Sequence, residues 1–140
     1  MIDINKILYN ANLYSIEFSG FISLKFTLTD ESTLNNICDD VTLEFINGAI
    51  LIDNNGKKVE SIQNIFYLFG SSIKYSALLN NGIEIEFDNG FKIKSENPNV
   101  EDELLDRNWV LSETVSGNYI IFNDTNNIVV SEVFKEFVLK

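Results

Sequence analysis

Apolar and polar side chains alternate along much of the chain, which is the pattern of strands that bury one face. The clearest case is residues 13–28, where the alternation continues across the dipeptide Ser19-Gly20. This stretch predicts two antiparallel strands joined by a tight turn, with a common buried face that carries Tyr14, Ile16, Phe18, Ile22, Leu24, Phe26 and Leu28.

The same hairpin signal occurs twice further along the chain. Residues 41–52 and 83–94 both carry Glu-Phe-x-Asn-Gly among alternating apolar positions. Asn and Gly tolerate positive φ, so each copy predicts a β-hairpin that turns at Asn47-Gly48 or at Asn89-Gly90. The recurrence favours a duplicated hairpin unit, although Asn-Gly is common enough in hairpins to recur without duplication.

The period of the pattern changes between these two copies. Apolar residues there are spaced three, four and three positions apart, as on one face of an amphipathic α-helix: Val59, Ile62, Phe66 and Phe69. Gly70 follows, at the position where a helix often ends in the left-handed conformation. Beyond it, residues 73–93 predict a three-stranded meander. The chain from Trp109 onward predicts further strands, with residues 128–138 open between strand and helix.

These elements predict the fold class and the domain organisation. The chain has 140 residues and is 45% hydrophobic, and a domain of this length can bury about two-thirds of its unfolded surface. Nothing in the composition suggests a linker. We expect a single α+β domain over residues 1–140, mainly antiparallel β-sheet built from repeated hairpins, with one or two short helices.

The balance of charge narrows the range of partners. Ten basic residues against 21 acidic residues give a formal net charge of −11. Nucleic acids and anionic lipid surfaces are bound through Lys and Arg, so we expect the chain to bind neither. A negative field instead accelerates encounters with basic proteins. The simpler alternative is that the acidity only keeps the protein soluble.

Two further features bear on the compartment. Cys38 is the single cysteine, so no disulfide can form within the chain. The first residues lack a basic start followed by a continuous apolar run, and no apolar segment approaches the roughly 20 residues that span a bilayer. We therefore expect a cytoplasmic protein without a membrane segment.

The sequence lacks the usual parts of an active site. It contains no histidine, which removes the commonest general base and the commonest transition-metal ligand. Cys38 stands beside Asp39 and Asp40, whose charges are expected to raise the pKa of its thiol and weaken it as a nucleophile. Phosphate-binding and calcium-binding loops are also missing. We expect no catalytic residue, no metal site and no cofactor.

Paired carboxylates define an alternative function. Glu84 and Glu86 share one face of their predicted strand, and two carboxylates are the groups that a glycosidase uses. Together with Tyr75 they would mark a small-molecule-binding or enzymatic β-rich domain. The opposite face of this strand is apolar and faces the core, so the simpler interpretation is that these acids are solvated surface residues.

Negative charge is densest in residues 96–106, just before Arg107 and Trp109. Such a segment predicts a partner-binding surface, because opposed potentials steer a basic protein toward it and an aromatic residue supplies buried area. The alternative is a solvated acidic loop with Trp109 in the core, and we expect Trp109 to be buried. The predicted partner-binding residues are Glu96, Glu101, Asp102, Glu103 and Asp106.

One part of the chain resembles a known class of proteins. The run Leu79-Asn80-Asn81-Gly82, then Asp88-Asn89-Gly90, then an acidic stretch and Asn108-Trp109-Val110-Leu111 is similar to small bacterial domains of the kind found among toxin-system immunity proteins. The resemblance covers about residues 41–130. It implies a non-enzymatic, cytoplasmic module that neutralises a basic toxin domain by covering its active site. A purely structural subunit is the third hypothesis.

Overall fold

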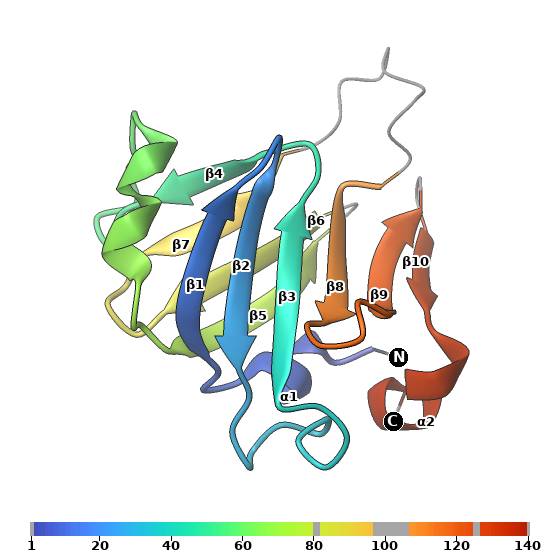
Figure 1. Ribbon diagram of the computed structural model, residues 1–140. Helices are drawn as coiled ribbons and strands as arrows, with labels where there is room; N and C mark the ends of the chain where they lie inside the picture. The colour runs from blue at the N-terminus through green and yellow to red at the C-terminus, as the bar shows by residue number, and fades with distance from the viewer. Residues whose placement is uncertain (1, 80–81, 97–106, 125–126, 140) are drawn as a thin grey trace.

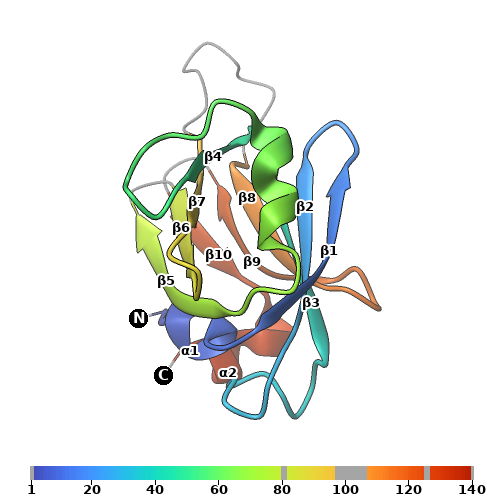
Figure 2. The same ribbon diagram turned by 90° about the vertical axis from the view of Figure 1, so that its left-hand side faces the viewer.

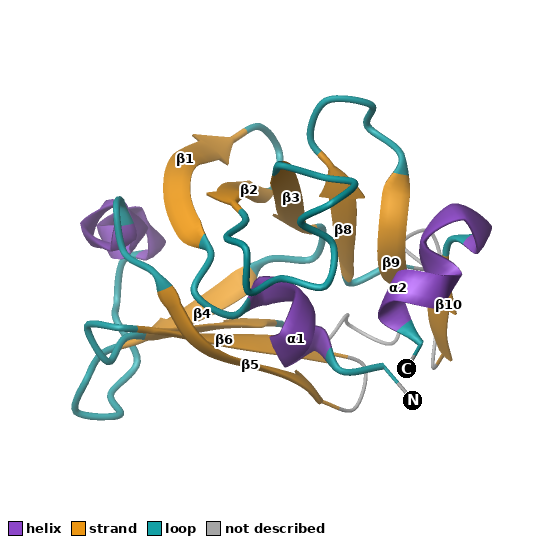
Figure 3. Cartoon of the chain, turned by 90° about the horizontal axis from the view of Figure 1, so that it is seen from below, coloured by secondary structure: helices purple, strands orange, loops and turns teal. Residues whose placement is uncertain are grey.

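The computed structural model describes residues 2–79, 82–96, 107–124 and 127–139. Its strands form two antiparallel sheets packed face to face, and in Figure 1 the strands of one sheet cross behind those of the other at a steep angle. Figure 3 shows the same two layers from below. The expectation of a mainly antiparallel, β-rich α+β fold with short helices is confirmed.

The larger sheet has six strands in the order β1-β2-β3-β8-β9-β10. Their bounds are Asn12–Phe18 (β1), Ile22–Thr27 (β2), Asp40–Phe45 (β3), Trp109–Glu113 (β8), Tyr119–Asp124 (β9) and Asn127–Val130 (β10). The smaller sheet has four strands in the order β4-β7-β6-β5. These are Ala49–Ile52 (β4), Ile73–Leu79 (β5), Gly82–Phe87 (β6) and Lys92–Ser95 (β7).

The hydrophobic core fills the space between the two sheets. In β3, Val41, Leu43 and Phe45 are fully buried and alternate with polar residues on the outer face, as a period of two requires. Phe26 of β2 and Phe87 of β6 stack across the two layers, with ring centroids 6.4 Å apart. The alternation in the sequence therefore specifies which face of each strand meets the opposite sheet.

The two sheets are joined along one edge. The amide of Leu13 donates to the carbonyl of Ser71 over 2.9 Å, and the amide of Ile73 donates to the carbonyl of Ala11 over 2.8 Å. These bonds tie the start of β1 to the start of β5 and close the sandwich on that side. They also fix the position of the helix that precedes β5.

The first predicted hairpin is confirmed, because β1 pairs with β2. Its predicted buried face is wrong in β1, where Tyr14 is 36% exposed and Phe18 is 45% exposed. Phe18 is opposite the buried residue Ile22 and shares its face, and it is exposed because it ends the edge strand of the sheet. Tyr14 is turned outward by a break in register between Leu13 and Ser15, which places Leu13, fully buried, in the core. A bulge of this kind changes which residues face inward.

The two copies of Glu-Phe-x-Asn-Gly do not form two equivalent hairpins. Residues 83–94 do, since β6 pairs with β7. Residues 41–52 do not, because β3 pairs with β2 and β8, whereas β4 pairs with β7. The turn at Asn47-Gly48 thus carries the chain from one sheet to the other. A turn motif fixes only a local reversal, and the partners of each strand are set by which apolar faces can be buried together.

The turn between β6 and β7 has one residue more than predicted. The amide of Gly90 donates to the carbonyl of Phe87, and the amide of Phe87 donates to the carbonyl of Phe91. Asp88, Asn89 and Gly90 therefore form a three-residue loop in which Gly90 alone has positive φ. This is the arrangement of a turn that ends in a left-handed residue, the second most common hairpin connection.

The predicted helix after β4 exists, but its period differs from the prediction. The segment Ile62–Leu68 (η1) is a 3-10 helix, and its buried residues are Ile65 and Leu68, with Ile62 partly buried. A 3-10 helix has three residues per turn, so positions three apart share a face. Phe66 and Phe69, predicted to be buried, are therefore exposed. Gly70 has a φ of +84°, which confirms its predicted left-handed conformation.

Short helices at the two ends complete the fold. Ile4–Leu8 (α1) begins after Asp3, whose carboxylate accepts from the amide of Asn5, and it packs against β5. Near the C-terminus, β10 is followed by Glu132–Phe134 (η2) and Lys135–Val138 (α2), so the ambiguous segment contains both strand and helix. None of the helices in the described ranges has the length and apolar character that a membrane crossing requires.

Candidate functional site

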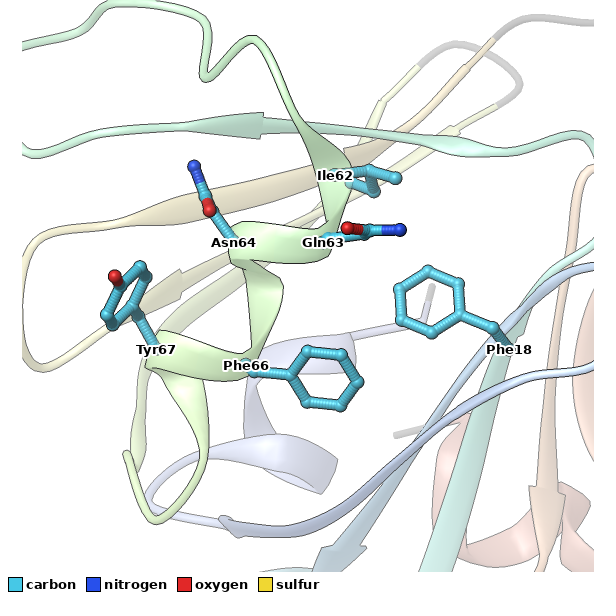
Figure 4. Close-up of a pocket in the computed structure, with 6 residues that line it drawn as sticks. All are labelled: Phe18, Ile62, Gln63, Asn64, Phe66 and Tyr67. Atoms are coloured by element: carbon cyan, nitrogen blue, oxygen red, sulfur yellow. The ribbon is translucent and has the colours of Figure 1, made fainter.

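An open pocket of about 730 Å³ lies between η1 and the end of β1. Figure 4 shows Phe66 of η1 and Phe18 of β1 pointing toward each other across it. Their ring centroids are 5.6 Å apart, with an angle of 55° between the ring planes. Such a tilted pair is a favourable aromatic contact, and it holds both rings at the wall of the pocket. The remaining lining residues are Ile62, Gln63, Asn64 and Tyr67.

A second hollow of about 490 Å³ adjoins the first and shares Phe18 and Ile62 with it. It runs past the tip of the β1–β2 hairpin to the turn at Asn47-Gly48. Together the two hollows form a continuous depression, here termed the aromatic groove, whose apolar lining residues are Phe18, Phe21, Ile22, Ile46, Ile62, Phe66 and Tyr67.

The aromatic groove exists because of the short helical period of η1. Burial of Ile65 and Leu68 uses one of the three faces of a 3-10 helix and leaves the other two faces outside the core. Those faces carry Phe66, which is 53% exposed, and Tyr67, which is 75% exposed. Soluble proteins seldom expose several large apolar side chains together unless another molecule covers them.

One of the predicted partner-binding residues lies at the end of the aromatic groove. Glu96 is exposed, and its amide donates to the carbonyl of Gly48 over 3.0 Å. Its carboxylate also lies against Gly48, since a Cβ added to that glycine would be 3.7 Å from the Cδ atom of Glu96. The other predicted residues, Glu101, Asp102, Glu103 and Asp106, lie outside the described residues.

The chain that follows the acidic segment is anchored by buried amides. The Oδ1 atom of Asn123 accepts from the backbone amides of Asn108 at 2.7 Å and Trp109 at 3.0 Å. The side chain of Asn47 donates to Oδ1 of Asn108 at 2.7 Å. These bonds tie the start of β8 both to β9 and to the turn that ends the aromatic groove.

Trp109 is fully buried, which confirms its predicted place in the core. Arg107, two residues earlier, lies over the ring of Phe122 with its Cζ atom 3.8 Å from the centroid. This cation–π contact orients the guanidinium across the outer face of the six-stranded sheet. Neither residue lines the aromatic groove.

The residues of the alternative function lie on the outer face of the four-stranded sheet. Tyr75 of β5 is opposite Glu86 of β6, so the structure brings these two together. Glu86 is also opposite Lys92 and lies within 3.8 Å of its ammonium group, and Glu84 is opposite Lys94. Cross-strand pairing with lysine gives both carboxylates an ordinary structural role on a sheet surface.

The environment of Cys38 makes its thiol a poor nucleophile. Burial is the main cause, and the nearby carboxylates of Glu113 and Asp39 add to it, so that the pKa of Cys38 is raised from 9.0 to about 12. The thiol donates to Oε2 of Glu113 over 3.6 Å. The predicted direction of the pKa shift is confirmed, and Glu113, which is distant in sequence, is the contributor that the sequence did not reveal.

Among the described residues, two other groups have perturbed pKa values. Burial raises the pKa of Tyr14, and the charge of Asp40 adds to this effect. Burial also raises the pKa of Glu44, which projects from the middle of β3. Within the described ranges, acidic and cysteine side chains do not gather into a group of three that would hold a metal ion.

Comparison with models of protein families, with curated proteins and with solved structures finds no match to this chain. The candidate site therefore depends on its own geometry. The aromatic groove was not predicted from the sequence, because the apolar periodicities place Phe18 and Phe66 on buried faces. The signal that was available is the run of aromatic residues at positions 66, 67 and 69, which no single helical face can bury.

Proposed function

We propose that the protein is a non-enzymatic protein-binding module, and specifically a cytoplasmic immunity protein that neutralises a basic toxin domain by covering its active site. The observation that carries the proposal is the exposed aromatic groove between η1 and β1. Aromatic side chains dominate the binding energy of many interfaces, because they bury large areas at a small cost in conformational entropy.

The shape of the aromatic groove favours a protein partner over a small molecule. Small-molecule sites enclose most of their ligand, whereas Tyr67 stands three-quarters exposed at the rim of an open depression. An anionic membrane surface is disfavoured as a partner by the net charge of −11. A protein surface that places apolar side chains into the groove matches both properties.

The charge of the chain supports a basic partner. Opposed potentials raise the rate of association, and the effect weakens as salt shortens the Debye length to about 8 Å at physiological ionic strength. Glu96 lies against Gly48 at the end of the aromatic groove, so charge and apolar area are adjacent there. In this proposal, the acidic residues that follow Glu96 in sequence form the charged rim of the interface.

The proposal is tested by copurifying the chain with the protein encoded beside it and measuring association rates across a salt series. One variant replaces the proposed rim with amides at Glu96, Glu101, Asp102, Glu103 and Asp106. A control with the same change in net charge replaces five exposed acids elsewhere: Asp30, Glu31, Asp88, Asp124 and Glu136. We expect slower association and a weaker salt dependence for the first variant than for the control. Equal rates in the two variants would remove the acidic segment from the interface.

A further inference from the structure

The outer edge of β1 is only partly covered. Its first residues are covered because Leu13 exchanges two backbone hydrogen bonds with the segment before β5: it donates to Ser71 and accepts from Gly70. Beyond the bulge, β1 continues to Phe18 as the last strand of the six-stranded sheet. The second half of β1 therefore forms a sheet edge that no strand of the described chain covers.

The hydrogen bonds of the neighbouring strands show which backbone groups point to this edge. The amide of Leu28 donates to the carbonyl of Asp39, so the backbone of Leu28 points toward β3. In an antiparallel sheet, the backbone groups of successive residues point to alternate sides. Leu24 and Ile22 therefore also point toward β3 and away from β1.

The register then fixes the direction in β1. Ile16 is opposite Leu24, and Phe18 is opposite Ile22. Since these β2 residues direct their backbone groups to β3, the amides and carbonyls of Ile16 and Phe18 point away from β2, to the free edge. Among the described residues, neither has a backbone partner in a further strand.

The aromatic groove lies directly beside this free edge. Phe18 belongs to both, because its backbone points to the edge and its ring lines the pocket. Figure 2 shows η1, the green helix, on the same side of the molecule as β1. Residues of η1, among them Phe66 and Tyr67, line the groove opposite Phe18. Unpaired backbone donors and acceptors on one side and apolar side chains on the other are the two components of a site that receives an added strand.

We propose that an extended segment of the basic partner adds to the free edge of β1 as a further strand and places an apolar side chain in the aromatic groove, against the paired rings of Phe18 and Phe66. This inference rests on the proposed function and specifies its binding mode. The backbone groups of Ile16 and Phe18 would supply affinity, and the groove would select an apolar residue at alternate positions of the segment.

The charge of the chain identifies the occupant as a basic protein and not a second copy of the chain. Two copies would bring together two bodies that each carry a net charge of −11, and this repulsion opposes their association. A segment that alternates apolar residues with Lys or Arg has the opposite charge. It also presents the side-chain period that a strand beside β1 requires.

The probe is a library of short random peptides displayed on phage, panned on the wild-type protein and counter-selected on Phe18→Ser. We expect the selected peptides to alternate apolar and basic residues. A synthetic copy of the best peptide should bind Phe18→Ser at least about tenfold more weakly than wild type. Tyr75→Ser is the matched control, because Tyr75 is similarly exposed on the outer face of the other sheet, and binding should be unchanged.

A second measurement separates strand addition from simple apolar contact. The selected peptide is synthesised with N-methyl groups on alternate amides, in the two possible phases. Only one phase blocks the amides that face β1, so we expect one form to lose binding and the other to keep it. Equal binding of the two forms overturns the inference. Failure to select any peptide that depends on Phe18 does so as well.

The oligomeric state of the chain alone tests whether a second copy occupies the edge of β1. If the chain alone forms dimers that Phe18→Ser abolishes, a second copy is the occupant and the inference is overturned. The peptide and self-association measurements test the binding mode separately from the proposed function. A partner captured by the full protein, without any difference between the two N-methylated forms, leaves the proposed function standing and removes only the binding mode.

Discussion

Gly90 adopts a backbone conformation that other residues reach only with strain. Its φ is +89°, and a Cβ atom added there would lie 2.9 Å from the Cβ of Asn54. Gly117 has a similar φ of +74° but open space around it. Substitution at Gly117 therefore measures the free-energy cost of a positive φ alone. Substitution at Gly90 measures that cost together with the cost of the close contact with Asn54.

We expect Gly117→Ala to lower the free energy of unfolding by about 1 kcal/mol, the strain of a left-handed alanine. Gly90→Ala should cost more, about 2 to 3 kcal/mol, because Asn54 must also move. Chemical denaturation of both variants measures the difference. Equal costs would show that the contact with Asn54 does not constrain the turn.

Cys38 yields a prediction about pH. Its folded pKa of about 12 lies above the ordinary value of 9.0, so the folded protein holds the thiol proton more tightly than the unfolded chain does. The resulting stabilisation is fully present below pH 9 and is lost as pH rises toward 12.

We therefore expect the native thiol of Cys38 to react with a thiol reagent at pH 8 far more slowly than a free cysteine does, and to react normally once the protein is unfolded in urea. The reaction rates are followed by absorbance or by mass spectrometry. A native rate equal to that of free cysteine would contradict the buried, carboxylate-flanked position of the thiol.

At the scale of single residues, the sequence predicted backbone conformation better than burial. Gly70 and Gly90 have the positive φ that their positions suggested. Tyr14 and Phe18 were assigned to the core. A bulge that no residue pattern indicates turned Tyr14 outward, and Phe18 is exposed because it ends the edge strand of the sheet. The alternation rule fails after a bulge, because it assumes an unbroken register.

Among the elements, η1 differs most from its prediction. A 3.6-residue period predicted burial of Phe66 and Phe69, whereas the three-residue period of η1 buries Ile65 and Leu68. In so short a segment, the helix type depends on which side chains can be buried against the sheets. Intrinsic helix propensity does not distinguish a 3-10 helix from an α-helix there.

Alanine substitutions in η1 distinguish the two periods. We expect Ile65→Ala and Leu68→Ala each to reduce the free energy of unfolding by about 2 to 5 kcal/mol, because both remove fully buried side chains. Phe66→Ala and Phe69→Ala should cost about 1 kcal/mol or less. Urea denaturation of the four variants measures this. Larger losses of stability for Phe66→Ala and Phe69→Ala than for Ile65→Ala and Leu68→Ala would indicate the α-helical pattern. Phe66 would then be buried and would not line the aromatic groove.

The base of the acidic segment depends on Asn123. Its Oδ1 accepts two backbone amides at the start of β8, and the side chain is buried. We expect Asn123→Ala to destabilise the protein by about 2 to 4 kcal/mol, since two buried donors lose their acceptor. The amides of Asn108 and Trp109 should then lose hydrogen-exchange protection. Unchanged protection at both amides would show that other bonds hold this strand.

Strand pairing shows why the sheets were only partly predictable. Local turns correctly indicated the β1–β2 and β6–β7 hairpins. The pairs β3–β8 and β4–β7 join residues far apart in sequence, and no local signal distinguishes them from the predicted hairpin of residues 41–52. Such pairs are fixed by the burial of faces on folding, which a single sequence does not display.

For the whole molecule, the sequence revealed the charge and the structure revealed the apolar surface. A net charge of −11 indicated a basic partner, and the acidic segment was the predicted contact. The structure adds the aromatic groove, in which Phe18 and Phe66 come from elements some 45 residues apart and meet only through folding. The candidate site therefore combines negative charge, which the composition shows, with an apolar surface that only the folded structure shows.

The central claim is that the aromatic groove binds a protein partner. It is tested most directly by the affinity of the chain for the protein encoded beside it, measured for wild type, for Phe66→Ser with Tyr67→Ser, and for the control Tyr75→Ser. Circular dichroism confirms that all three are folded. We expect the groove variant to bind at least about tenfold more weakly, with the control unchanged. Equal affinity in the three proteins would contradict the account.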